Sequence, residues 1–285
     1  MSTWRLHDRT LEFPPPLGAG IVNVTDDSFF SGARSGTPDQ AAADGRALVD
    51  AGFDLLDVGA VAARSGPPVP AEEEAARLVP AVERLAADSG VPVLADTFSP
   101  EVAARALGAG AAGINDTGGG AAEGMLDLVA ETGCGYVLMH IEGPPRADRS
   151  SPDYGDPVEH LKGWFGNRID AAVARGVDED QIALDPGFDF DLSVDDDVEV
   201  LRRLGELRDL GRPLFVALSR KDFLGALVAG SWEHRVPAEE REAATLAATS
   251  LAVAHGAEVL RLHDPSALDA LRTAAAITGA GAQHG

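Results

Sequence analysis

The chain has 285 residues, of which 45% are hydrophobic and 24% charged, the composition of an ordinary globular protein. Its 46 acidic and 23 basic residues give a formal net charge of −23, which argues against nucleic acid or an anionic membrane as a partner. No apolar run reaches membrane-spanning length, no signal peptide is recognisable, and a single cysteine excludes an internal disulfide, so we expect a cytoplasmic protein.

Short apolar runs alternate along the chain with longer segments of helical period, which is typical of repeated parallel βα units. The predicted strands are 20–24, 55–58, 92–95, 113–115, 135–139, 182–185, 214–218 and 259–262. The predicted helices are 38–50, 71–87, 100–107, 124–131, 157–175, 194–210, 238–254 and 266–277.

Eight strands, each followed by a helix, predict a single (β/α)8 TIM barrel over residues 1–285. Residues 1–17 are expected to cover the bottom of this barrel. An open doubly wound sheet is the alternative, but no strand is followed by the glycine pattern of a dinucleotide site.

Polar residues gather where the predicted strands end, and in such a barrel this rim carries the active site. Acceptors and donors that suit a flat nitrogen heterocycle come from Asp96, Asn115, Asp185 and Lys221. Groups that suit a phosphate or pyrophosphate with Mg2+ come from Asn23, Arg64, Arg261 and His263.

Lys221 is one of only two lysines, and it stands three residues after the end of the seventh predicted strand. A lysine ammonium is compact enough to hydrogen-bond a ring heteroatom at the bottom of a pocket, which a guanidinium cannot do. An ordinary solvated lysine after a strand is the alternative.

Some of the polar residues near the rim can be explained without a ligand. Asp57, Asp116, Asp27 and Ser28 are expected to support the site or to cap helices. The acidic stretch 189–195 imitates a calcium-binding loop, but valines stand at the positions that need glycine and glutamate. No two histidines have zinc-site spacing along the chain, so zinc is not expected.

Eight stretches of the sequence resemble the dihydropteroate synthase family, in the family's order. They are residues 21–29, 54–59, 96–97, 114–116, 137–140, 184–187, 219–221 and 261–263. The resemblance implies an enzyme of folate biosynthesis that joins a pterin pyrophosphate to p-aminobenzoate, with Mg2+ as cofactor and small molecules as partners. It also implies a homodimer, with residues 270–280 packed against a second copy.

The resemblance assigns roles to the polar residues on the rim. It implies Lys221, Arg261 and His263 as catalytic residues and Asn23 as the metal ligand. The substrate-binding residues that it implies are Asp96, Asn115, Asp185, Lys221, Arg64, Ser219, Phe190 and Met139.

The part of the site that would bind the second substrate departs from the family pattern. A threonine and a proline of the family's second loop are replaced by Ala63 and Ser65, and a serine near the p-aminobenzoate carboxylate is replaced by Asp222. Because Asp222 would repel that carboxylate, we expect a remodelled pocket and sulfonamide tolerance. Two alternatives are a pterin-binding paralogue without synthase activity and the pterin-binding barrel of a folate-dependent methyltransferase.

Overall fold

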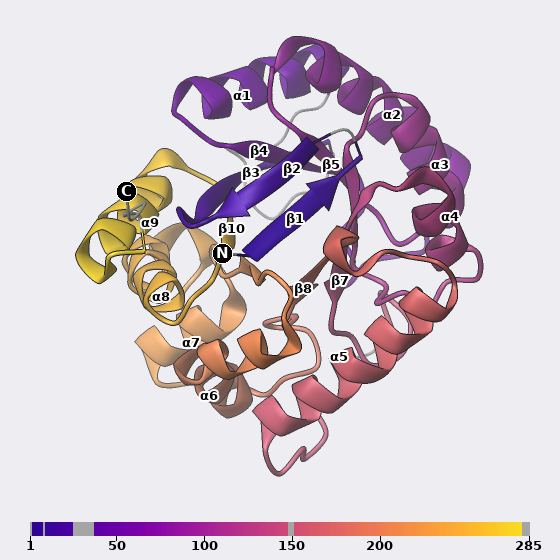
Figure 1. The fold of residues 1–285 in the computed structure, drawn as a ribbon. Coiled ribbons are helices and arrows are strands. Elements are labelled where there is room, and N and C mark those ends of the chain that lie inside the picture. The colour runs from indigo at the N-terminus through magenta and orange to yellow at the C-terminus, as the bar shows by residue number, and fades with distance from the viewer. Residues whose placement is uncertain (1, 8, 25–36, 148–150, 281–285) are drawn as a thin grey trace.

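The structure, a computed structural model, describes residues 2–7, 9–24, 37–147 and 151–280. Eight strands form one sheet in the order β8-β7-β6-β5-β4-β3-β10-β9, and every pairing within it is parallel. The strands are β3 Leu17–Asn23, β4 Leu55–Gly59, β5 Val93–Asp96, β6 Gly113–Asp116, β7 Gly135–Met139, β8 Ile182–Asp185, β9 Phe215–Ala217 and β10 Val259–Leu262. A parallel bridge between Leu184 and Leu214 joins the two edge strands and closes the sheet. This confirms the predicted (β/α)8 barrel (Figure 1).

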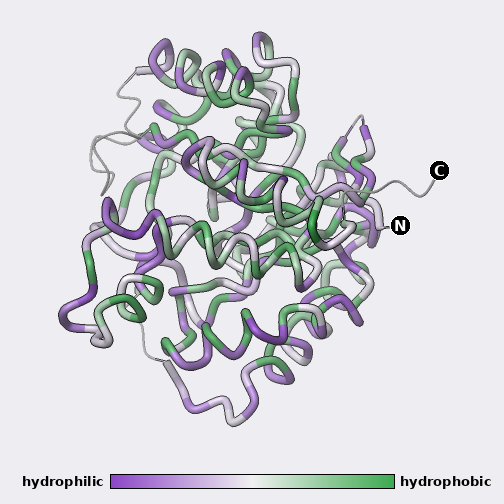
Figure 2. Tube along the Cα trace, turned by 90° about the vertical axis from the view of Figure 1, so that its left-hand side faces the viewer, coloured by the Kyte–Doolittle hydropathy of each residue, from purple (hydrophilic) through white to green (hydrophobic). Residues whose placement is uncertain are grey.

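Helices surround the barrel, and Figure 2 shows hydrophilic and hydrophobic residues alternating along them. They are α1 Pro38–Asp50, α2 Ala71–Asp88, α3 Pro100–Gly108, α4 Met125–Thr132, α5 Pro157–Ala174, α6 Val194–Arg202, α7 Asp222–Ala229, α8 Glu242–Ala254 and α9 Pro265–Thr278. Four of them begin with a side-chain cap followed by proline, a pair that satisfies the first N–H groups and presets the backbone. The caps are Thr37, Ser99, Asp156 and Asp264.

The prediction of one continuous helix over 194–210 is wrong. Helix α6 ends at Arg202, and a 3-10 helix, Leu204–Leu210, follows it. Gly205 lies at this break, where a Cβ atom would come within 3.1 Å of the His255 carbonyl oxygen. Glycine at this position therefore allows the two backbones to lie close together. Helix α7 was not predicted, because its eight residues are too short and too apolar to show a helical period.

A two-stranded antiparallel hairpin, β1 Ser2–Leu6 and β2 Arg9–Phe13, lies across the end of the barrel where the strands begin (Figure 1). Trp4, Leu6 and Phe13 are buried and form one cluster with side chains of the barrel strands. The Trp4 indole N–H donates to the Gln181 carbonyl oxygen at 2.7 Å, and its ring packs edge-on against Phe215. The hairpin therefore closes this end with apolar side chains, which leaves the carboxyl ends of the strands as the open end.

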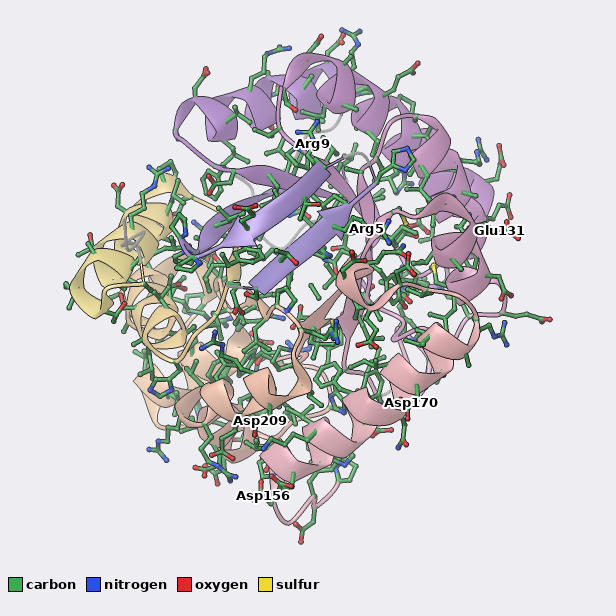
Figure 3. All side chains as sticks on the ribbon, in the orientation of Figure 1. Arg5, Arg9, Glu131, Asp156, Asp170 and Asp209 are labelled. Atoms are coloured by element: carbon green, nitrogen blue, oxygen red, sulfur yellow. The ribbon has the colours of Figure 1, made fainter. Side chains whose placement is uncertain are left out.

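Many charged side chains lie on the outer surface. In Figure 3 the labelled residues Glu131, Asp156 and Asp170 project outward from the ring of helices, while Arg5 and Arg9 belong to the hairpin. Arg5 pairs with Asp178 and Asp180 and so ties the hairpin to the segment before β8. Within the described ranges, no helix combines the length and the apolar character that crossing a bilayer requires.

Replacing Trp4 with alanine is expected to lower the free energy of unfolding by about 3–5 kcal/mol, because it leaves a cavity and an unpaired Gln181 carbonyl. Urea unfolding followed by circular dichroism measures the loss. Trp232→Ala is the matched control, since Trp232 is 39% exposed. An equal loss in both variants would contradict the role assigned to the hairpin.

Candidate active site

A network of charged and amide side chains crosses the open end of the barrel. Asp57 on β4, Asp96 on β5 and Arg261 on β10 meet there: Arg261 donates through Nε to Asp57 and through Nη2 to Asp96 Oδ2, the latter at 2.7 Å. Asn115 on β6 donates its amide to Asp57 Oδ2 at 3.0 Å. Four strands thus contribute to one connected cluster, which we call the mouth network.

The mouth network brings Asp96 and Asn115 together as the sequence predicted. It differs from the prediction in two residues. Arg261 was assigned to the anion-binding group, but its guanidinium lies between Asp57 and Asp96, of which Asp96 belongs to the other group. Asp57 was expected only to support the site, yet it accepts from both Arg261 and Asn115. The sequence did carry a signal for this role. Asp57 is a carboxylate inside an apolar strand, and a buried charge requires a partner.

Burial shifts the carboxyl groups of the site toward their neutral forms. It raises the pKa of Asp96 to about 7 although Arg261 opposes the shift, and the nearby Asp57 contributes to the rise. Burial also raises the pKa of Asp185 to about 6, against the hydrogen bond from Gly187 N–H and the charge of Lys221. Near neutral pH these two groups therefore exist in both forms, so they can donate as well as accept a hydrogen bond.

Lys221 lies between the ends of β8 and β9, where it immediately precedes α7. Its ammonium donates to the Phe188 carbonyl oxygen at 2.8 Å and lies 5.0 Å from the centre of the Phe190 ring. Burial lowers the pKa of Lys221, while the carboxylates of Asp189 and Asp185 oppose that shift. The predicted neighbourhood of Lys221, Asp185 and Phe190 is thus present in the fold.

Asp222, the first residue of α7, is surrounded by three arginines. Arg64 Nη1 and Arg241 Nη1 donate to it at 2.5 and 2.7 Å, and Arg235 Nε lies 3.2 Å from Oδ1. Burial alone would raise the pKa of Asp222, but Arg64 and Arg241 outweigh it and the pKa is lowered. We call Arg64, Arg235, Arg241 and Asp222 the arginine cluster. Arg235 and Arg241 were not predicted, because they lie far along the chain from any strand end.

Asp189 binds the start of α7 directly. Its carboxylate accepts from the backbone N–H groups of Asp222 and Phe223, the latter at 2.8 Å, and lies 3.7 Å from Arg64 Nη1. The backbone at Asp189 has a φ of 68°, a conformation that glycine adopts more readily. Asp189 therefore anchors the start of α7.

His263 and Ser219 form a pair at the ends of β10 and β9. His263 Nδ1 lies 2.9 Å from Ser219 Oγ. Burial, with the charges of Arg261 and Arg220, lowers the pKa of His263 to about 3, so the ring is neutral at physiological pH. His263 can thus contribute hydrogen bonds to a ligand but no charge.

The remaining predicted residues lie on the same rim or outside the described part. Asn23 ends β3 with a half-buried side chain, and Met139 ends β7 with a buried one. Asp116 accepts from the backbone N–H groups of the loop that follows it, which is the supporting role expected of it. Asp27 and Ser28 lie outside the described residues.

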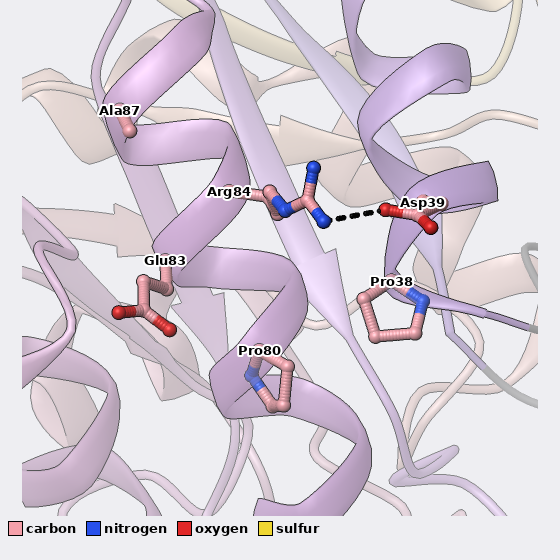
Figure 4. A pocket seen from close by; sticks show the side chains of 6 residues that line it. All are labelled: Pro38, Asp39, Pro80, Glu83, Arg84 and Ala87. Carbon is pink, nitrogen blue, oxygen red and sulfur yellow. Dashed lines mark ion pairs between the residues drawn. The ribbon is translucent and has the colours of Figure 1, made fainter.

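A surface hollow elsewhere does not carry comparable chemistry. It lies between the start of α1 and the middle of α2 (Figure 4), on the outside of the ring of helices. Its charged side chains include Asp39 and Arg84, which pair with each other at 2.7 Å. The hollow therefore lacks the convergence of groups from several strands that marks the mouth network.

Comparison with known proteins gives matches over nearly the whole chain. A family model described as pterin binding enzyme matches residues 19–263. The dihydropteroate synthase of Mycobacterium leprae is 40% identical over 281 residues, which are 96% of this chain and 97% of that protein. A Yersinia pestis dihydropteroate synthase in a sulfonamide drug complex is 33% identical with a TM-score of 0.90, covering 98% of this chain and 99% of that chain. A Xanthomonas albilineans dihydropteroate synthase with 4-aminobenzoic acid is 38% identical with a TM-score of 0.83, covering 97% and 98%.

The raised pKa of Asp96 predicts a pH dependence of stability. Because the folded protein holds this proton above pH 4 and the unfolded chain does not, Asp96 contributes stability at low pH that is lost as the pH rises toward 7. Asp96→Asn removes this contribution. The fall in unfolding free energy between pH 4.5 and 7.5 is therefore expected to be smaller in the variant by about 1 kcal/mol or more.

Urea titrations at several pH values measure this difference. Asp269→Asn is the matched control, since Asp269 is exposed on α9, and it should follow the unmodified protein. Parallel pH profiles for the protein and Asp96→Asn would show that Asp96 is ionised throughout and would contradict the prediction.

Proposed function

Because this chain belongs to the dihydropteroate synthase family, we propose that it joins 6-hydroxymethyl-7,8-dihydropterin pyrophosphate to p-aminobenzoate and releases pyrophosphate. It would thus act as a transferase of folate biosynthesis. The observation that supports this most is the mouth network, together with Lys221 and Asp185 beside it. Polar groups converge there from the ends of separate strands, which is how barrel enzymes build active sites.

We propose that the pterin ring binds at the mouth network. Among the described residues, Asp57 Oδ1 and Asn115 Oδ1 are buried without a hydrogen-bond partner, so the network has acceptor capacity left over. Asp96 and Asp185 accept from the ring N–H and amino groups in their ionised forms, and in their protonated forms each can instead donate to a ring nitrogen or carbonyl. Lys221 supplies the donor for a ring heteroatom.

The pyrophosphate end is proposed to lie at Asn23, Arg261 and His263, with Mg2+. Asn23 offers one amide oxygen at the end of β3, and Mg2+ needs few protein ligands because phosphate oxygens and water complete its shell. Asn23 is therefore a suitable ligand for Mg2+. Bound Mg2+ would stabilise the charge that develops on the departing pyrophosphate. The chain itself contributes by holding the two substrates in position and by hydrogen bonding, with little acid–base chemistry.

The arginine cluster changes the expectation for the second substrate. Asp222 alone would repel the p-aminobenzoate carboxylate, but three arginines and the two carboxylates of Asp222 and Asp189 leave one positive charge in excess. This supports binding of an arylamine carboxylate near Arg64. The affinity is proposed to be modest, because Asp189 already accepts from the first N–H groups of α7.

A pterin-binding protein without synthase activity is the second candidate function. Asp189 and Asp222 favour it, since both carboxylates lie where the start of α7 would otherwise attract an anion. Pterin binding without turnover would select this candidate.

We also propose a cytoplasmic homodimer. The last two helices, α8 and α9, expose Leu251 and Ile277, the latter 80% exposed, and apolar residues of this kind suit packing against a second copy. Cys134 is buried and not in a disulfide, which agrees with a reducing compartment. Sedimentation equilibrium measures the association state.

The proposed activity is tested by incubating the protein with pterin pyrophosphate, p-aminobenzoate and Mg2+ and measuring dihydropteroate and released pyrophosphate. Lys221→Met is expected to lower kcat/KM about 100-fold or more, because the buried donor to the pterin is lost. Lys162→Met is the matched control, since it removes the other lysine, which lies on α5 and pairs with Asp209. No product from the unmodified protein would refute the synthase proposal.

Replacing Asp222 with serine is expected to lower the KM for p-aminobenzoate about 5-fold, since a repulsion of about 1 kcal/mol is removed. The concentration of a sulfonamide that halves the activity should fall in parallel, while the KM for pterin pyrophosphate stays unchanged. Asp222→Asn, which removes the charge and keeps the size, should behave similarly. A raised KM for p-aminobenzoate in both variants would instead show that Asp222 is needed to hold the arginines.

A further inference from the structure

Three side chains outside the mouth network present potential metal ligands to one another. His140 follows β7, Glu142 lies two residues later, and His160 belongs to the first turns of α5. Nε2 of His140 lies 3.3 Å from Nε2 of His160, and Glu142 Oε1 lies 3.2 Å from His160 Nε2 and 3.7 Å from His140 Nε2. This is the group of histidine, cysteine and carboxylate side chains within the described ranges whose ligand atoms converge closely enough for a metal ion.

The distances fit one tetrahedral ion. Zn2+ binds imidazole nitrogen and carboxylate oxygen at about 2.0–2.2 Å, so its ligand atoms lie about 3.3–3.6 Å apart. The three observed separations, 3.2, 3.3 and 3.7 Å, lie close to this range. We propose that His140, Glu142 and His160 bind one divalent ion of the Zn2+ or Co2+ class, which fastens the loop after β7 to helix α5.

The surroundings hold the ligands in place before any ion arrives. The His140 ring is fully buried and packs edge-on against Trp164, with ring centres 5.0 Å apart. The His160 ring lies 4.0 Å from that of Tyr154, whose hydroxyl donates to the Asp191 carbonyl oxygen. Packing of this kind reduces the ordering that metal binding requires.

The cluster is also accessible from solvent. The side chains of His160 and Glu142 are 27% and 40% exposed, while that of His140 is buried. An ion can therefore enter from the surface, bind the buried imidazole on its inner side and keep a water molecule as a fourth ligand. Two imidazole nitrogens and one carboxylate favour a borderline metal over Mg2+, which prefers oxygen ligands, so this site is chemically distinct from the one proposed at Asn23.

Spacing along the chain gave no indication of zinc, because twenty residues separate the two histidines. The fold brings them together, because the start of α5 meets the residue that follows β7. The competing explanation is a hydrogen bond between the two imidazoles, which needs no ion. Metal binding and its dependence on Glu142 distinguish the metal site from the hydrogen-bonded pair, because a hydrogen bond between two histidines does not require a third side chain.

The test uses the full-length, untagged protein, freed of metal with a chelator and titrated with Co2+ while its visible absorption is recorded. We expect one equivalent bound, with displacement by Zn2+. His160→Ala and Glu142→Gln should each weaken binding at least about 10-fold, as loss of one ligand from a small set does. His234→Ala, which removes an exposed histidine beside Ser231, should bind as the unmodified protein does.

Thermal unfolding gives an independent readout. Zn2+ at about 100 times its dissociation constant should raise the melting temperature by roughly 5 °C in the protein and in His234→Ala, and by about half as much or less in Glu142→Gln. Absence of Co2+ uptake, or equal affinity in Glu142→Gln and the unmodified protein, would overturn the proposal. Neither measurement depends on synthase activity, so this proposal and the proposed function can fail separately.

Discussion

The buried pairing of Arg261 with Asp57 and Asp96 is the interaction on which the open end of this barrel depends. Two carboxylates from neighbouring strands would repel each other in a water-poor cavity, and the chain as a whole is strongly acidic. One guanidinium satisfies both, because its fork presents separate donors to each. Such a network contributes little net stability, since desolvation offsets much of the attraction. Its effect is to hold polar groups from four strands in a fixed arrangement.

The same arrangement depends on the opposite end being sealed. Trp4 and its neighbours fill the barrel where the strands begin, so water and ligands reach the interior from one side only. Restricted access lowers the effective dielectric constant around the carboxyl groups. Burial is therefore the largest cause of the raised pKa values of Asp96 and Asp185. The hairpin thus influences the chemistry of the site from the opposite end of the barrel.

The sequence predicted the features that depend on local pattern. Apolar runs located the barrel strands, and segments of helical period located most of the helices, because both signals lie within one stretch of the chain. Asp96, Asn115, Asp185 and Lys221 were found because they follow strands. Contacts between distant segments were not predictable: the pairing of Asp222 with Arg235 and Arg241, and the meeting of His140 with His160, arise only when the helices pack.

A single bridge between Leu184 and Leu214 joins the β8 and β9 edges of the sheet, so this is the weakest strand pairing of the barrel. Side chains reinforce that seam at the open end: Lys221, beyond β9, donates to the Phe188 carbonyl beyond β8, and Asp189 accepts from the backbone at the start of α7. A ligand that touches both Asp185 and Lys221 adds a further cross-link between the two edges. Ligand binding at the site therefore stabilises the closure of the whole barrel. It is expected to slow the exchange of the β8 and β9 amide hydrogens with solvent.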